Sequence, residues 1–244
     1  MNTDAVQQQE RGTAVITGAS RGIGRAIALN LAEEHFSVGL IGRDLHELEE
    51  VAAACREFGV QARSYAVDLR HAEHIEDLMP QVVSDLGGIT VLVNNAGVCI
   101  ERDVREATLE EWDTTFAVNM RAVFAMTRAA LPYLQQATSA AIINISSIAD
   151  QRTYAGGTMY TASKHALAGF SGSLFQDVHE QGIKVSTISP GYVNTAMHEN
   201  DPRLEPSRML QPEDIAQAVR FVVNFPGNAC PTEITIVPQR SPKK

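Results

Sequence analysis

The sequence contains few of the residues that mark secreted, nucleic-acid-binding or membrane proteins. Its three cysteines, Cys55, Cys99 and Cys230, are scattered and follow no metal-binding or redox spacing, so no disulfide framework is expected. Only 20 lysines and arginines oppose 29 acidic residues, and the net charge of −9 disfavours nonspecific nucleic-acid binding. No apolar run approaches the length of a membrane span, and the first dozen residues lack an apolar signal core. These absences predict a soluble, cytoplasmic protein that binds neither nucleic acid nor membrane.

Linkers and internal repeats are also missing. The 244 residues, 44% of them hydrophobic, are enough for one sizeable core, and no Pro/Gly/Ser-rich stretch divides them. We therefore predict one domain over residues 12–238. It is flanked by a flexible N-terminal tail, 1–11, and a polar C-terminal tail, 239–244, both expected to be frayed.

Short apolar runs alternate with helical patterns along the whole domain. Such runs indicate buried strands of a parallel sheet with helices on both faces. The predicted strands are 14–17, 37–41, 62–67, 91–93, 141–145, 184–188 and 233–237. The fold class is therefore predicted to be α/β, with a doubly wound parallel sheet.

A glycine-rich turn joins the first predicted strand to an amphipathic helix in TAVITGASRGIGRAIALNLAEE, which runs from Thr13 to Glu34. Gly18, Gly22 and Gly24 permit unusual backbone angles and let a pyrophosphate approach main-chain amides at the helix N-terminus. The last glycine also allows the helix to pack against the strand. This segment predicts a nucleotide cradle.

The second predicted strand is followed by Arg43, at the position where nucleotide-binding sheets meet the adenosine ribose. An arginine there pairs with a 2′-phosphate and stacks on adenine, whereas a carboxylate would bind a free 2′-hydroxyl. Arg43 therefore favours NADP(H). A shift of one residue would place Asp44 at this position and favour NAD(H) instead.

Tyr160 and Lys164 lie one helical turn apart in YTASK, so both side chains can reach the same bound molecule. A free tyrosine titrates near about 10, and a nearby cation lowers its pKa. A turn of small residues, NNAG (94–97), directly follows another predicted strand. The strand in INISS (143–147) closes with two hydroxyl side chains. Ser147 stands thirteen residues before Tyr160. The tyrosine–lysine pair predicts acid/base chemistry.

In order and spacing, TGASRGIG, NNAG, the serine at a strand end and YTASK resemble the short-chain dehydrogenase/reductase family over nearly the whole chain. The resemblance implies a Rossmann-like fold and an NADP-preferring oxidoreductase acting on carbonyl or secondary alcohol groups. It implies that Ser147 holds the carbonyl oxygen and that Tyr160 is the general acid/base. Lys164 would lower the tyrosine pKa and bind the nicotinamide ribose. Asn119, in FAVNMRAVF, would hold a water leading from the lysine to solvent.

The resemblance further implies a set of cofactor-binding residues. Arg21 would lie beside the 2′-phosphate, Asp68 would bind the adenine amino group, and Val193 and Thr195 would bind the carboxamide. The complete expected set is Gly18, Ser20, Arg21, Gly22, Ile23, Gly24, Arg43, Asp68, Leu69, Asn95, Ala96, Gly97, Tyr160, Lys164, Pro190, Gly191, Val193 and Thr195. No metal is expected.

The substrate is defined only as a small-molecule carbonyl or alcohol. The expected pocket walls are mildly apolar, and the short segment between Thr195 and Pro212 favours small or extended substrates. These wall residues are Cys99, Ile100, Ala149, Tyr154, Tyr192, Met197 and His198. The C-terminal EITIVPQRSPKK resembles that of broad carbonyl and sepiapterin-like reductases.

Two alternatives remain open. The core motifs are equally similar to those of 3-oxoacyl-[acyl-carrier-protein] reductases, for which a basic patch of Arg102, Arg105, Arg121 and Arg128 would be expected. The other alternative is a nonenzymatic NADPH-sensing or scaffold protein. The resemblance also implies a homodimer or homotetramer, with the helices that carry Asn119 and Tyr160 forming the dimer face.

Overall fold

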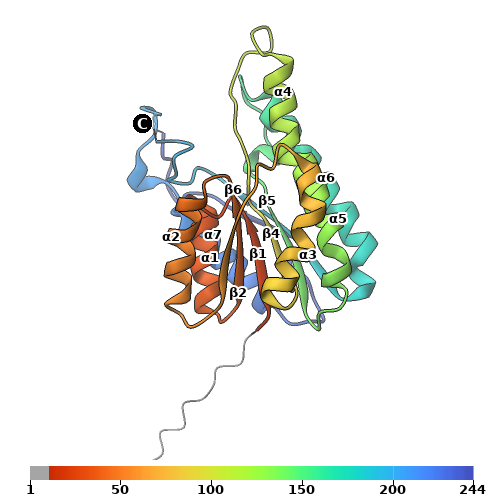
Figure 1. Ribbon diagram of the computed structural model, residues 1–244. Helices are drawn as coiled ribbons and strands as arrows, with labels where there is room; N and C mark the ends of the chain where they lie inside the picture. The colour runs from red at the N-terminus through yellow and green to blue at the C-terminus, as the bar shows by residue number, and fades with distance from the viewer. Residues whose placement is uncertain (1–10, 200, 244) are drawn as a thin grey trace, which may run out of the picture.

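The computed structural model describes residues 11–199 and 201–243, so the predicted N-terminal tail, 1–11, lies outside it except for Arg11. Its strands form one parallel sheet in the order β3-β2-β1-β4-β5-β6-β7 (Figure 1). The bounds are β1 (Thr13–Thr17), β2 (Ser37–Gly42), β3 (Ala62–Ala66), β4 (Val91–Asn94), β5 (Ala140–Ile145), β6 (Ile183–Pro190) and β7 (Glu233–Ile236). The predicted Rossmann-like, doubly wound sheet is confirmed, and every predicted strand boundary lies within two residues of the observed one.

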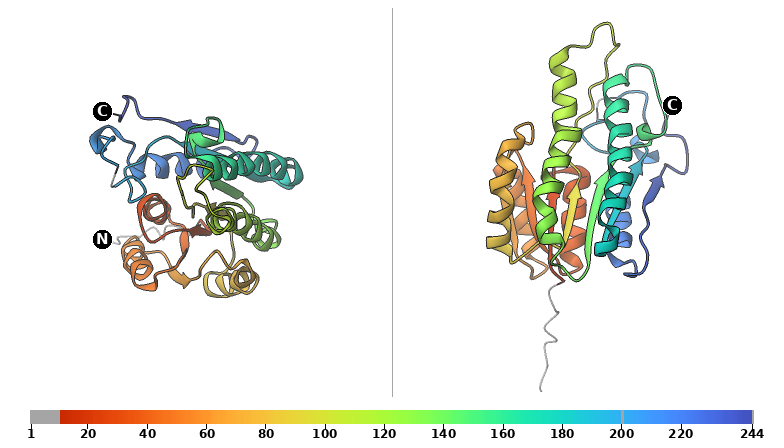
Figure 2. Two further views of the ribbon diagram at one scale, coloured as in Figure 1. Left: turned by 90° about the horizontal axis from the view of Figure 1, so that it is seen from above. Right: turned by 90° about the vertical axis from the view of Figure 1, so that its right-hand side faces the viewer.

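Helices cover both faces of the sheet (Figures 1 and 2). On one face, Ile27 and Leu48 belong to the apolar core beneath α1, α2 and α7. On the other, Met79 and Met126 belong to the core beneath α3, α5 and α6. The bounds are α1 (Gly22–Glu33), α2 (Leu45–Arg56), α3 (Ile75–Leu86), α5 (Ala122–Leu134), α6 (Thr158–Val178) and α7 (Pro212–Asn224). Within the described ranges, no helix is long and apolar enough to cross a membrane.

The direction of winding reverses between β1 and β4, which are neighbours in the sheet. In open parallel sheets, ligands bind at the carboxyl edge where the strand order reverses. Because parallel strands all end at the same edge, the glycine turn after β1, NNAG after β4, Ser147 after β5 and Pro190 at the end of β6 converge there. The topology therefore gathers all the sequence motifs at one edge.

One long helical segment projects beyond this edge (Figures 1 and 2). It consists of α4 (Leu109–Phe116), a π-helical segment, Ala117–Arg121, and then α5. Its start is fixed by a capping box in which Thr108 and Glu111 exchange hydrogen bonds. A π-helical turn widens the backbone and is frequent at functional sites, and this one contains Asn119.

The end of the chain differs from the frayed tail predicted for 239–244. Leu204 and Lys243 form an antiparallel bridge, and the Glu205 N–H donates to the Pro242 carbonyl at 2.8 Å. Leu204 and Pro242 are both buried. The polar composition concealed this contact because the partner segment lies almost forty residues earlier and meets the tail only in the folded protein.

Candidate active site

A groove of about 1690 Å³ runs along the carboxyl edge of the sheet. It is lined by the loops that follow β1, β2, β3, β4, β5 and β6 and by the first turns of α6. All of the expected cofactor-binding and catalytic residues line the groove except Gly24 and Asn119. The predicted residues thus gather along one groove, and the two exceptions are buried and do not line it.

The glycine turn at one end of the groove needs its glycines for two reasons. Gly18 and Gly22 have positive φ angles of 64° and 54°, a backbone region that other residues rarely adopt. At Gly24 a Cβ atom would lie 2.1 Å from the Gly18 carbonyl oxygen. The first two glycines therefore shape the turn, whereas the third lets α1 approach it closely. Arg21, which precedes α1, makes no side-chain cap, so the helix N-terminus faces the groove with its amides available to an anion.

Two arginines line the groove beside this turn. Arg21 and Arg43 are exposed, and neither has an ion-pair partner among the described residues. Asp44 instead caps α2, where its carboxylate accepts hydrogen bonds from the N–H groups of His46 at 2.9 Å and Glu47 at 3.2 Å. The two arginines therefore share this end of the groove with the carboxylates of Asp44 and Glu47.

Asp68 lies beyond the end of β3 and is half-buried. The Arg70 guanidinium donates to it, with an Nη2–Oδ2 distance of 2.5 Å, and this hydrogen bond lowers the pKa of the Asp68 carboxyl to about 2. Asp68 is therefore a permanently charged acceptor near neutral pH.

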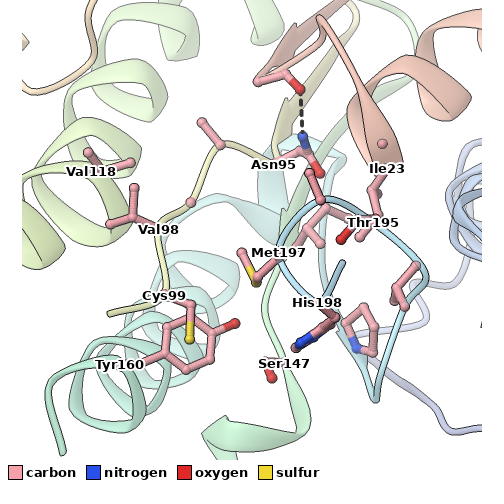
Figure 3. A pocket seen from close by; sticks show the side chains of 18 of the residues that line it. Ile23, Asn95, Val98, Cys99, Val118, Ser147, Tyr160, Thr195, Met197 and His198 are labelled. Atoms are coloured by element: carbon pink, nitrogen blue, oxygen red, sulfur yellow. Dashed lines mark hydrogen bonds between the residues drawn. The ribbon is translucent and has the colours of Figure 1, made fainter. Parts of the chain in front are cut away.

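Asn95 ties the ends of β1 and β4 together. Its side-chain amide donates to the carbonyl oxygens of Thr17 at 2.9 Å and Gly18 at 3.2 Å, as the dashed line in Figure 3 illustrates. The Thr17 hydroxyl oxygen in turn accepts from the N–H groups of Asn95 and Ala96, each at 3.0 Å. These bonds make the floor of the groove rigid.

Asn119 is fully buried, and its side chain is satisfied by protein atoms. Its Oδ1 accepts from the Val98 N–H at 2.9 Å, and its Nδ2 donates to the Val98 carbonyl at 2.9 Å and to the Ser163 hydroxyl at 3.0 Å. Ser163 donates to the Tyr160 carbonyl at 2.7 Å. Asn119 therefore fixes the turn of α6 that carries Tyr160 against the loop after β4. The water-holding role stays a prediction.

Tyr160 and Lys164 lie on the buried face of α6. Figure 3 shows the Tyr160 ring beside Ser147 and Cys99, with Thr195, Met197 and His198 across the pocket. Lys164 donates from Nζ to the Ile145 carbonyl at 3.0 Å, and its Nζ lies 5.7 Å from the centre of the Tyr160 ring. Side chains that lie as far apart in the sequence as Cys99 and His198 thus line one pocket.

Burial dominates the electrostatics of this pair. It lowers the pKa of Lys164 to about 8 and raises the pKa of Tyr160, although the Ser147 hydroxyl acts in the opposite direction on the tyrosine. Burial is the largest cause of the raised Tyr160 pKa, and a lowering of this pKa by Lys164 stays a prediction. Tyr160 is therefore held in its protonated form, which is the form that donates a proton.

At the far end of the groove, Cys99 and Tyr154 approach each other, with 3.9 Å between the sulfur and the phenol oxygen. Burial raises the pKa of the Cys99 thiol to about 11, so it is uncharged near neutral pH. Sequence reasoning missed four charged residues here, Glu101, Arg152, Arg203 and Lys243. The proximity of Glu101 to Cys99 in the chain was a usable signal. Lys243 arrives through the C-terminal contact and had none.

The arginines proposed as a basic patch are largely neutralised. Arg102 pairs with Glu111 at 2.9 Å, Arg105 with Asp103 at 2.7 Å, and Arg128 with Glu76. Arg121 donates to the Arg70 carbonyl at 2.7 Å. The patch therefore carries little uncompensated positive charge. In the described part of the chain, no three His, Cys, Asp or Glu residues are grouped to hold a metal.

Comparisons of the sequence and of the structure with known proteins agree with each other. A family model described as short chain dehydrogenase matches residues 12–205. An uncharacterised oxidoreductase of Staphylococcus epidermidis is 33% identical over 92% of this chain and 96% of its own. A metagenomic short-chain oxidoreductase solved with NADP has a TM-score of 0.83 and 33% identity, covering 95% of this chain and 99% of that one. A 3-ketoacyl-ACP reductase of Sinorhizobium meliloti has a TM-score of 0.84 and 30% identity, covering 92% and 97%.

Proposed function

This chain belongs to the short-chain dehydrogenase/reductase family, and we propose that it is an NADP(H)-dependent reductase of small carbonyl compounds in which Tyr160 is the general acid. The observation that carries the proposal is the buried meeting of Tyr160, Lys164 and Ser147 at one end of the groove. The glycine turn and two arginines without ion-pair partners among the described residues lie at the other end.

The groove fits NADP(H) by its own chemistry. The amides at the N-terminus of α1 suit a pyrophosphate, and Arg21 and Arg43 suit the additional 2′-phosphate. Asp68 lines the groove and is proposed to accept a hydrogen bond from the adenine amino group. Val193 and Thr195 also line the groove, with Thr195 next to Gly22, and are proposed to hold the carboxamide. The related metagenomic enzyme is described in complex with NADP, which supports this choice of cofactor.

The mechanism follows from the protonation state of the site. When bound, NADPH supplies a hydride to the carbonyl carbon. Ser147 donates a hydrogen bond to the carbonyl oxygen, and Tyr160 transfers its proton to the same oxygen, so the carbonyl becomes an alcohol. Lys164 keeps a positive charge beside the tyrosinate that remains and is proposed to bind the ribose hydroxyls.

The direct test is NADPH consumption with a panel of ketones, diketones, aldehydes, quinones and 3-oxoacyl thioesters, repeated with NADH. We expect turnover of at least one carbonyl class with NADPH. NADPH binding without turnover of any panel member would contradict the proposal.

Arg43→Ala is expected to raise the KM for NADPH by about 10- to 100-fold, because one charge-assisted contact to the 2′-phosphate is lost. The KM for NADH should change much less, since NADH lacks that phosphate. Steady-state kinetics with both coenzymes measure the difference. Arg25→Ala is the matched control, because Arg25 is exposed on α1 and does not line the groove. An equal effect of Arg43→Ala on both coenzymes would remove Arg43 from phosphate recognition.

A 3-oxoacyl-[acyl-carrier-protein] reductase is the second candidate, supported by the similarity to the Sinorhizobium meliloti enzyme. Pairing of Arg102, Arg105 and Arg128 with acids weighs against a surface for an acidic carrier. Higher kcat/KM for 3-oxoacyl thioesters than for simple ketones would favour this candidate. A nonenzymatic NADPH sensor would require the assembled Tyr160 and Lys164 to be idle, and turnover in the panel would eliminate it.

We infer that copies of the chain associate through the face formed by α4, α5 and α6. Phe124 on α5 is 52% exposed and meets Phe170 of α6 edge-on, while Trp112 on α4 is 40% exposed. Solvent-exposed aromatics clustered on one face favour an interface. The cytoplasmic location expected from the composition stays a prediction.

Phe124→Glu is expected to convert the oligomer to a smaller species, since it places a charge in the proposed apolar contact. Light scattering coupled to size-exclusion chromatography measures the mass. Phe221→Glu is the control, because Phe221 is similarly exposed, at 50%, but lies on α7. That variant should retain at least a dimer. An unchanged mass for Phe124→Glu would place the interface elsewhere.

A further inference from the structure

Asp150 is a buried acid next to the proposed catalytic residues to which sequence reasoning assigned no role. It ends the short 3₁₀ turn Ile148–Asp150, whose N-cap is Ser147. The side chain accepts a hydrogen bond from the Ser189 hydroxyl at 2.5 Å, and the residue is only 7% exposed. The other carboxylate oxygen, Oδ1, is buried and has no hydrogen-bond partner among the described residues.

Burying an ionised carboxylate costs free energy, because the carboxylate loses its hydration. A nearby positive charge offsets this cost. The 3₁₀ turn packs against α6, the helix that carries both Tyr160 and Lys164. Lys164 is only 4% exposed and is therefore a buried positive charge in the same region. Asp150 and Lys164 are thus a buried acid and a buried base on two elements that pack against each other, and neither has an ion-pair partner at contact distance among the described residues.

Other titratable groups face the same site from the loop after β4. Cys99 is an uncharged thiol near neutral pH, because its pKa is raised to about 11. Glu101 is exposed at the mouth of the groove, where water screens its charge. Asp150 is therefore the buried carboxyl group that the turn after β5 brings to this site.

We propose that Asp150 is a positioning residue whose buried negative charge keeps Lys164 charged and Tyr160 protonated, while its hydrogen bond to Ser189 holds the turn that carries Ser147. This inference rests on the proposed role of Tyr160 as the general acid. The hydrogen bond joins the turn after β5 to the end of β6, next to Pro190 and Gly191, which line the groove. Asp150 thus connects the proposed proton donor with the wall on which the nicotinamide would rest.

The sign of the effect is the same for both groups. A negative charge favours the ammonium over the neutral amine and disfavours the phenolate, so Asp150 raises the pKa of Lys164 and of Tyr160. Removing the charge lowers both pKa values. Reduction needs protonated Tyr160, so without the charge its rate should fall off at a lower pH than in the wild-type protein. Oxidation needs the phenolate, so its rate should begin to rise at a lower pH.

The test is Asp150→Asn, which keeps the size of the side chain and removes its charge. We expect the alkaline limb of kcat/KM for reduction and the acidic limb for oxidation both to move down by about one pH unit. Alcohol oxidation near neutral pH should accelerate by up to about tenfold. Asp177→Asn is the matched control, because Asp177 is exposed at the other end of α6. It should leave both limbs in place.

A second readout does not depend on turnover. NADPH binding, followed by its fluorescence, should weaken as Lys164 loses its proton near pH 8, and Asp150→Asn should move this transition about one pH unit lower. If the wild-type protein turned over no substrate, the proposed function would fail, yet this measurement would still decide the role of Asp150.

Ser189→Ala separates the charge from the hydrogen bond. It should lower kcat without moving either pH limb, because the carboxylate remains. Unchanged limbs and an unchanged binding transition in a folded Asp150→Asn protein would overturn the inference. So would an equal pH displacement in Ser189→Ala, since the effect would then come from the bond and not from the charge.

Discussion

Tyr160→Phe is expected to lower kcat for carbonyl reduction by about 1000-fold or more, while NADPH binding changes by less than about threefold. The substitution removes one hydroxyl oxygen and keeps the ring that packs on α6. General acid catalysis of this kind contributes about 10²- to 10⁴-fold. The proposed proton donor is lost without a large change in packing, so the effect should fall on kcat. Stopped-flow hydride transfer and fluorescence titration of NADPH separate the two quantities.

Tyr154→Phe provides the matched control, because Tyr154 also lines the groove and lies six residues earlier in the chain. Its hydroxyl approaches the Cys99 sulfur at 3.9 Å, and its ring is 42% exposed. We expect this variant to lose less than about tenfold in kcat. Retention of most turnover by Tyr160→Phe would assign the proton transfer to another group.

Gly24→Ala is expected to destabilise the fold by about 3 kcal/mol, or roughly 6–12 °C in Tm, and to weaken NADPH binding at least about tenfold. A Cβ at this position would lie 2.1 Å from the Gly18 carbonyl oxygen and 2.6 Å from the Asn95 amide nitrogen. The oxygen belongs to the backbone of the glycine turn, so it cannot rotate away. Relief requires α1 to move from the sheet, and its N-terminal amides move with it. Thermal unfolding with and without NADPH measures both effects.

Gly172→Ala serves as the comparison for the same chemical change. Gly172 is also helical, in α6, and a Cβ there would meet no atom within 4 Å. Alanine has the higher helix propensity, so the Tm should stay the same or rise slightly. If Gly24→Ala had as little effect as Gly172→Ala, the close approach of α1 to the turn would not limit stability.

The central strands were predictable because each is a short apolar run that is buried in the middle of a layered fold, whereas the edge strands β3 and β7 are partly exposed. Ile16 in β1 and Ile143 in β5 are fully buried, as their apolar surroundings in the sequence suggested. Helix and strand signals are local, so a few neighbouring residues were enough to place β2 from Ser37 and β5 to Ile145. The predicted groove residues followed from the same cause, since most of them directly follow a strand.

The cofactor-binding end of the groove depended on local chemistry as well. Arg43 could be proposed for phosphate recognition because its position after β2 determines where its charge lies. The competing interpretation, Asp44, also lines the groove, and one of its carboxylate oxygens caps α2. The two interpretations differ by a single position in the chain, and the solved relative in complex with NADP favours Arg43.

The sequence by itself determined the order of the strands and helices along the chain and the family. It also determined that the polar site residues follow the carboxyl ends of the strands. Each of these depends on patterns a few residues long. The tertiary structure alone decided that burial raises the pKa of Tyr160, that Asp150 contributes a buried charge and that Lys243 reaches the groove. Desolvation and charge coupling depend on how closely distant segments pack, and spacing along the chain carries no measure of that distance.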